Sequence, residues 1–192
     1  MQAAAVSRWN KESPVSGEIM RSLRELNCGF LELPGVGTDR LAALSAAQRA
    51  AVAGCPYALF DLRFFDDTHW QRRAHSAPAW SVADTPRVDG RIAVFAQSAL
   101  FYAWHVASTA RMSARLLLGM HDRTAAALGN ITVDRLPALA LTESPNLTAR
   151  FRHCDAYWSA LAEAAARSDR ARLRRVQLYG LQLSAAAQLP CR

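Results

Sequence analysis

Apolar side chains recur at intervals of three and four residues along most of this chain, and this spacing limits what it can fold into. Two runs show it most clearly, at Ile19, Leu23, Leu26, Phe30 and Leu33, and at Leu173, Val176, Gly180, Leu183 and Ala187. Residues at this interval lie on one face of an α-helix, and that face is stable only when another element covers it. Only 9 of the 192 residues are glycine, which also favours helix. The sequence therefore predicts an all-α fold.

Helix start and stop signals divide these runs into separate elements. The residues expected to cap or open a helix are Ser16, Ser45, Asp66 or Asp67, Asp122, Thr132 and Asp169. Ser45 and Gln48 have the spacing of a capping box, in which each side chain accepts a hydrogen bond from a free backbone N–H. Gly54 and Pro56 are expected to end that helix. Pro137 is expected to kink or shorten the helix that contains it.

The most apolar stretch, residues 93–107, is expected to form a buried central helix. Fifteen residues of helix are about 22 Å long, less than the roughly 30 Å of a bilayer's hydrocarbon core. We therefore expect no insertion into a membrane. His105 lies within this stretch and is predicted to be a core histidine with its polar atoms satisfied.

Breaker residues, among them Pro78 and Pro86, gather between residues 76 and 90 and predict a linker. The chain is accordingly divided into an N-terminal tail (1–15), a first helical half (16–75), the linker (76–90) and a second helical half with the C-terminal helix (91–192). The predicted architecture is two similar multi-helix halves packed into one compact bundle.

The two halves resemble one another when the second is shifted back by 87 positions. The matched features are a cap (Ser45 with Thr132), an Arg-Phe pair (Arg63-Phe64 with Arg150-Phe151) and, after one extra residue, a tryptophan (Trp70 with Trp158). Two such units bury a shared face that neither can bury alone. This pattern predicts a tandem duplication.

Part of the chain resembles the D subunit of the flagellar master transcriptional regulator. The resemblance rests on an apolar Leu-Gly turn, a short Ala-rich helix, a capped helix and an Arg-Phe end, at residues 114–120, 125–128, 131–132, 136–140 and 149–151. It implies an all-helical protein that works with a zinc-bearing partner subunit to activate transcription. The family dimer can carry an interchain disulfide, but the matching positions here are Phe60 and Leu147. The resemblance therefore implies a pseudo-dimer within one chain, without that disulfide.

The chain is basic, with a net charge of +7, and Lys11 is its only lysine. An excess of arginine suggests a nucleic-acid or acidic-protein partner, although GC-rich codons produce the same excess of arginine and alanine. The densest group is Arg170, Arg172, Arg174 and Arg175. These side chains could bind phosphates, or they could form a solvated face whose stems cover apolar surface.

No sequence pattern indicates a metal site, a cofactor or an enzyme. The four cysteines, Cys28, Cys55, Cys154 and Cys191, form no Cys-x-x-Cys pair, so we expect reduced thiols in a cytoplasmic protein. No phosphate-binding loop, dinucleotide fingerprint or nucleophile elbow is present. We therefore expect a non-enzymatic protein without metal or cofactor.

One segment is the best candidate for binding a protein partner. It comprises Arg63, Phe65, Asp66, Asp67, His69 and Trp70. Aromatic and arginine side chains are enriched at binding hot spots, and the acids and the imidazole add polar groups. The alternative is that the acids cap a helix and the tryptophan anchors the core.

The prediction for function is a regulatory or adaptor protein that acts by binding another protein, as a monomer or a homodimer. DNA contact would be weak or would come through the partner. Two alternatives stay open at this point. One is a DNA-binding transcription factor, and the other is a cytoplasmic accessory subunit of a flagellar or secretion apparatus.

Overall fold

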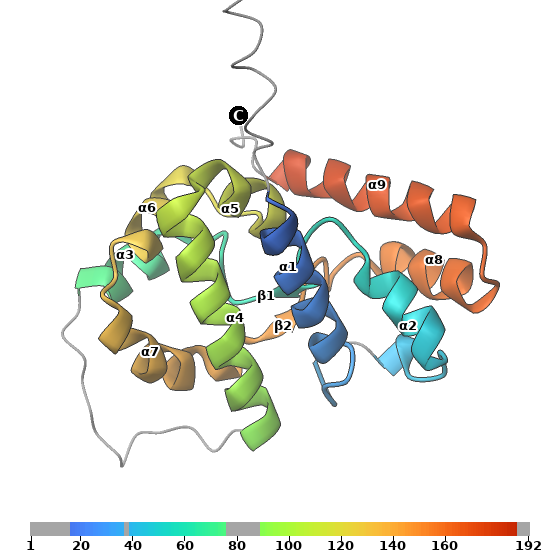
Figure 1. Ribbon diagram of the computed structural model, residues 1–192, viewed down its shortest axis with the longest axis horizontal. Helices are drawn as coiled ribbons and strands as arrows, with labels where there is room; N and C mark the ends of the chain where they lie inside the picture. The colour runs from blue at the N-terminus through green and yellow to red at the C-terminus, as the bar shows by residue number, and fades with distance from the viewer. Residues whose placement is uncertain (1–15, 37–38, 76–88, 188–192) are drawn as a thin grey trace, which may run out of the picture.

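The computed structural model describes residues 16–36, 39–75 and 89–187, and its architecture is all-α, as predicted (Figure 1). The first-half elements are α1 (Gly17–Phe30), a 3-10 turn (Asp39–Leu41), α2 (Ala46–Ala53), β1 (Phe60–Asp61) and α3 (Asp67–His75). The second-half elements are α4 (Gly90–Thr109), α5 (Arg111–Leu118), α6 (Asp122–Gly129), a 3-10 turn (Val133–Arg135), α7 (Leu136–Glu143), a 3-10 turn (Ser144–Asn146), β2 (Thr148–Ala149), α8 (Asp155–Ala166) and α9 (Arg170–Ala187).

Most of the predicted start signals act as expected. The Ser16 hydroxyl accepts a hydrogen bond from the Ile19 N–H at 3.2 Å. Ser45 and Gln48 form the full capping box at the start of α2. The predicted linker, residues 76–90, lies outside the described residues except for its last two, Asp89 and Gly90, which cap and begin α4.

The prediction for Thr132 is wrong in its detail. Thr132 precedes a 3-10 turn and its side chain makes no capping hydrogen bond. Pro137 explains the difference, because its ring is accepted only in the first turn of a helix. The α-helix therefore starts at Leu136, with the proline in its first turn, and is shortened as predicted.

Helix α4 lies in the middle of the molecule, between two groups of helices (Figure 1). One group contains α3, α6 and α7, and the other contains α2, α8 and α9. Each group mixes the two halves of the sequence, since α3 packs on α6 and α2 packs on α8. No helix in the described part of the chain is long and apolar enough to cross a membrane.

A short two-stranded ribbon joins the halves at the centre of the molecule. Strands β1 and β2 are antiparallel, with Phe60 opposite Ala149 and Asp61 opposite Thr148. The residues two positions after each strand, Arg63 and Phe151, both have left-handed backbone angles, with φ of 58° and 57°. The ribbon therefore places equivalent backbone turns at both of its ends.

The tryptophans that follow these turns also correspond. The Trp70 indole N–H donates to the Arg63 carbonyl at 3.1 Å, and the Trp158 indole N–H donates to the Arg150 carbonyl at 2.9 Å. Both indoles are buried. These shared features support the duplication, but the left-handed turn pairs Arg63 with Phe151. The sequence alignment instead pairs Arg63 with Arg150. At the turn, the structural alignment of the two halves is therefore shifted by one residue from the sequence alignment.

Candidate functional site: a groove between α1 and α4

Most side chains of the segment predicted to bind a partner make contacts within the protein itself. Trp70 is fully buried, so it cannot present a side chain to a partner as predicted. His69 is also buried, and its Nε2 lies 2.9 Å from the Glu143 carboxylate on α7. Arg73 Nε lies 2.7 Å from the other oxygen of the same carboxylate. These contacts hold α3 against α7.

The two acids of this segment stabilise helix α3 and its surroundings. Asp66 accepts a hydrogen bond from the His69 N–H at 2.9 Å and pairs with Arg63. The backbone hydrogen bond from His69, followed by Arg63, lowers the pKa of Asp66. Asp67 accepts from the Thr124 hydroxyl at 2.7 Å. The helix-capping alternative therefore describes Asp66 well. Of the predicted segment, Arg63 is exposed and Phe65, Asp66 and Asp67 are half-buried, whereas His69 and Trp70 are buried.

The arginines of α9 are not equivalent to one another. Arg172 donates to the Glu163 carboxylate at 2.6 Å, and Glu163 also pairs with Arg167. Within the described residues, no ion pair involves Arg170, Arg174 or Arg175, whose side chains are exposed. Of the four arginines predicted to bind phosphate, three therefore remain exposed and without an ion pair among the described residues.

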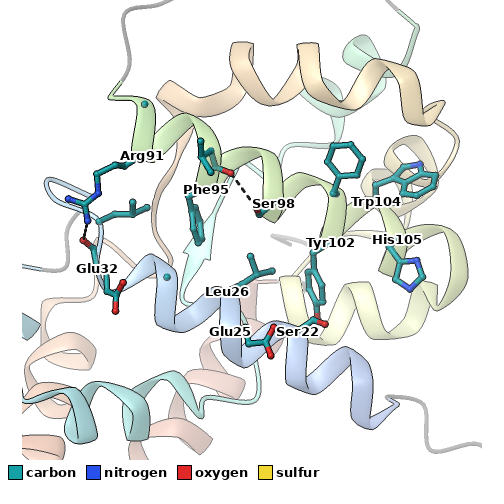
Figure 2. Close-up of a pocket in the computed structure, with 15 residues that line it drawn as sticks. Ser22, Glu25, Leu26, Glu32, Arg91, Phe95, Ser98, Tyr102, Trp104 and His105 are labelled. Atoms are coloured by element: carbon teal, nitrogen blue, oxygen red, sulfur yellow. Dashed lines mark hydrogen bonds between the residues drawn. The ribbon is translucent and has the colours of Figure 1, made fainter.

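An open groove of about 950 Å³ lies between α1 and α4 (Figure 2). The two helices are antiparallel, because Arg91 at the start of α4 donates to the Glu32 carbonyl after the end of α1, at 3.1 Å. At the opposite end, the Tyr102 hydroxyl donates to the Ile19 carbonyl at 3.2 Å. The groove therefore has the length of several helical turns.

Apolar side chains form the floor and one wall of the groove. Phe95 lies at its centre with Leu26 facing it (Figure 2). Phe95 also joins a buried aromatic cluster, with ring centroids 5.8 Å from Phe30 and 5.2 Å from Phe60. Along the rim, Val94 is 66% exposed, more than any other large apolar side chain in the described residues. The groove combines a rigid floor with an exposed apolar edge.

The α1 edge of the groove is acidic although the protein is basic. Glu25 and Glu32 line it, and Glu18 precedes them at the same seven-residue interval. All three are exposed, and none takes part in an ion pair among the residues that the structure describes. A seven-residue interval places these carboxylates along one line of the helix surface.

His105 lies at the end of the groove next to Tyr102 (Figure 2), and its side chain is exposed. The prediction of a core histidine is wrong. Helix α4 is apolar around most of its circumference, so its sequence alone indicated burial on all sides. Arg91, Ser98 and His105 interrupt the apolar residues of α4 every seven positions. This spacing was the feature of the sequence that indicated a solvent-exposed stripe along the helix.

The described cysteines give no indication of nucleophilic chemistry. Burial raises the pKa of the Cys55 thiol to about 12, so the reactive thiolate is scarce near neutral pH. Cys28 and Cys154 are half-buried. Among the described residues, no three His, Cys, Asp or Glu side chains come together in a way that could hold a metal ion.

Neither a family model, nor a curated protein, nor a solved structure matches this chain in comparisons. The resemblance to the flagellar regulator subunit therefore stays a prediction from its motifs.

Proposed function

We propose that this chain is a non-enzymatic regulatory or adaptor protein that binds a helix of a partner protein in the α1–α4 groove. The observation that carries the proposal is the exposed apolar rim at Val94 above a preformed aromatic floor. Amphipathic helices bind in such grooves through apolar residues spaced three and four apart. The resemblance to a transcriptional regulator subunit suggests that the partner acts in gene regulation.

The charges of the groove suggest the composition of the partner helix. The free carboxylates of Glu18, Glu25 and Glu32 favour lysine or arginine along one side of that helix. This acidic edge also disfavours nucleic acid at the groove, because phosphates would be repelled there. Any contact with DNA would fall elsewhere, with exposed Arg170, Arg174 and Arg175 on α9 as the candidates.

The test is to compare Val94→Glu with Met112→Glu in affinity-tagged protein purified from its native cells. Met112 is 58% exposed on α5 and does not line the groove, so it is a matched control. We expect Val94→Glu to lose a partner that the control retains, with both variants melting at the temperature of the unmodified protein. The recovered partner's helix, made as a peptide, should then bind the purified chain directly.

Two results would contradict the proposal. One is equal recovery of every partner by the two variants. The other is a change in oligomeric state by light scattering on Val94→Glu alone, which would assign the groove to a second copy of this chain.

A further inference from the structure

A second cavity lies at the ends of the central ribbon, apart from the groove, and its volume is about 760 Å³. Volumes of this size suit small organic molecules. The side chains that line it include Arg63, Arg150, Arg152, Asp61, Phe65 and Phe151. The cavity therefore combines guanidinium groups with aromatic surface and one acid.

Arg150 is the unusual residue in this cavity, because its charged side chain is only 1% exposed. Its Nη1 donates to the Leu117 carbonyl at 2.9 Å, and its Nη2 donates to the Ser184 hydroxyl at 3.0 Å. Its Nε is buried and has no hydrogen-bond acceptor within the described structure. Burying a cation is costly unless an opposite charge lies beside it.

The fold supplies aromatic rings around this cation, and no carboxylate in the described residues lies within ion-pair distance of it. The guanidinium carbon lies 5.7, 5.7 and 5.1 Å from the ring centroids of Tyr57, Phe65 and Phe151. Asp61 is the acid that lines the cavity, and burial raises its pKa. Its carboxylate also accepts a hydrogen bond from the Phe64 N–H at 3.0 Å. Asp61 thus has a backbone partner of its own and makes no ion pair with Arg150 among the described residues.

The backbone at Gly119 leaves the space that the Arg150 guanidinium group occupies. Gly119 ends α5 with φ of 71°, and a Cβ at this position would lie 2.2 Å from Arg150 Nη2. Only glycine allows both the left-handed angle and this close approach. The chain therefore holds the cation in one place, as a binding site requires.

The mouth of the cavity adds a second arginine that has no acid partner in the described part of the chain. Arg152 is exposed, and its Nε donates to His153 Nε2 at 3.0 Å. Its remaining N–H groups can face a bound anion. Arg63, by contrast, is already paired with Asp66.

From these contacts we infer that the cavity binds a small molecule bearing a phosphate or carboxylate group, with Arg152 at the mouth and Arg150 beneath it. Oxyanions are the ligands that guanidinium groups bind most strongly. The oxyanion accepts hydrogen bonds from Arg152 and compensates the buried charge of Arg150 beneath it, and Phe65 and Phe151 contact the organic part. This site is independent of the proposed groove.

The experiment titrates the full chain with phenyl phosphate and with benzoate, and with phenol and sodium chloride as controls. The readout is the NMR signal of the Arg150 Nε–H, together with the dissociation constant from calorimetry. We expect the signal to shift with one of the two anions and not with phenol or chloride. The anion that binds more tightly identifies the phosphate or the carboxylate as the preferred group.

Arg152→Gln is the test variant, because replacing buried Arg150 could prevent folding. We expect it to weaken anion binding roughly tenfold, as loss of a charge-assisted hydrogen bond does. Arg24→Gln, which removes an exposed arginine on α1, is the matched control and should bind as the unmodified chain does. An Arg150 signal that no anion moves, or equal affinities in both variants, would overturn the inference.

Discussion

At the residue scale, Gly180 shows how closely the last helix packs on the core. The hydroxyls of Tyr57 and Tyr157 lie 2.9 Å apart beneath α9. A Cβ on Gly180 would lie 1.9 Å from the Tyr57 hydroxyl oxygen. The sequence counts Gly180 as one more position on the apolar face of a helix, but the structure uses it as the point of closest approach.

We predict that Gly180→Ala destabilises the protein. Overpacking a core costs about 1–3 kcal/mol, which exceeds the gain of roughly 1 kcal/mol when alanine replaces glycine inside a helix. Gly17→Ala is the control, because a Cβ there meets nothing within 4 Å. Urea unfolding followed by circular dichroism gives both free energies. If the two variants had the same urea midpoint of unfolding, the Tyr57 side chain would be shown to move aside without loss of stability, which would contradict the prediction.

At the scale of an element, the capping serine of α2 and its predicted counterpart in the second half make different contacts. The Ser45 hydroxyl accepts a hydrogen bond from the Gln48 N–H at 3.3 Å, and the Ser45 N–H donates to Gln48 Oε1 at 2.8 Å. Gln48 also donates to the Ala166 carbonyl at 2.9 Å, which ties α2 to α8. Thr132 makes no capping bond.

Ser45→Ala should therefore lower the free energy of unfolding by about 1 kcal/mol, the usual value of an N-cap. Thr132→Ala should change it by less than about 0.5 kcal/mol, as exposed substitutions do. Thermal or urea unfolding of the two variants, measured side by side, tests the difference. Equal losses would mean that Thr132 does cap its helix in solution and that the two start signals are equivalent.

At the scale of the molecule, the two sequence halves exchange helices across the centre. Helix α3 packs on α6 of the second half, and α8 packs on α2 of the first. The His69–Glu143 contact at 2.9 Å and the central ribbon cross the same boundary. Because each half lacks part of its covering surface, neither half is expected to fold alone.

We predict that residues 1–80, produced alone, show little helix by circular dichroism and no cooperative melting. Co-expressed with residues 81–192, they should form a stable complex with the helical signal of the intact chain. The reason is that a cut between α3 and α4 removes no described contact, whereas separation exposes the buried Glu143 and the ribbon. A cooperative transition in the isolated first fragment would instead identify it as an independent domain.

The sequence by itself determined the helices and most of their ends. Ser45, Asp66 and Asp169 cap or open helices through hydrogen bonds to residues three positions away. Signals of this kind act within one helical turn, so they can be identified without knowledge of the rest of the fold. The all-α class follows from the same local periodicity.

Only the tertiary structure decided which faces stay open and which charges are buried. Helix α4 is apolar around most of its surface, and the placement of α1 leaves Val94 and His105 exposed along one stripe. Arg63 and Arg150 stand in matching Arg-Phe pairs, yet one is exposed and the other is buried against α9. Burial depends on elements distant in sequence, and the pattern of a single segment does not specify them.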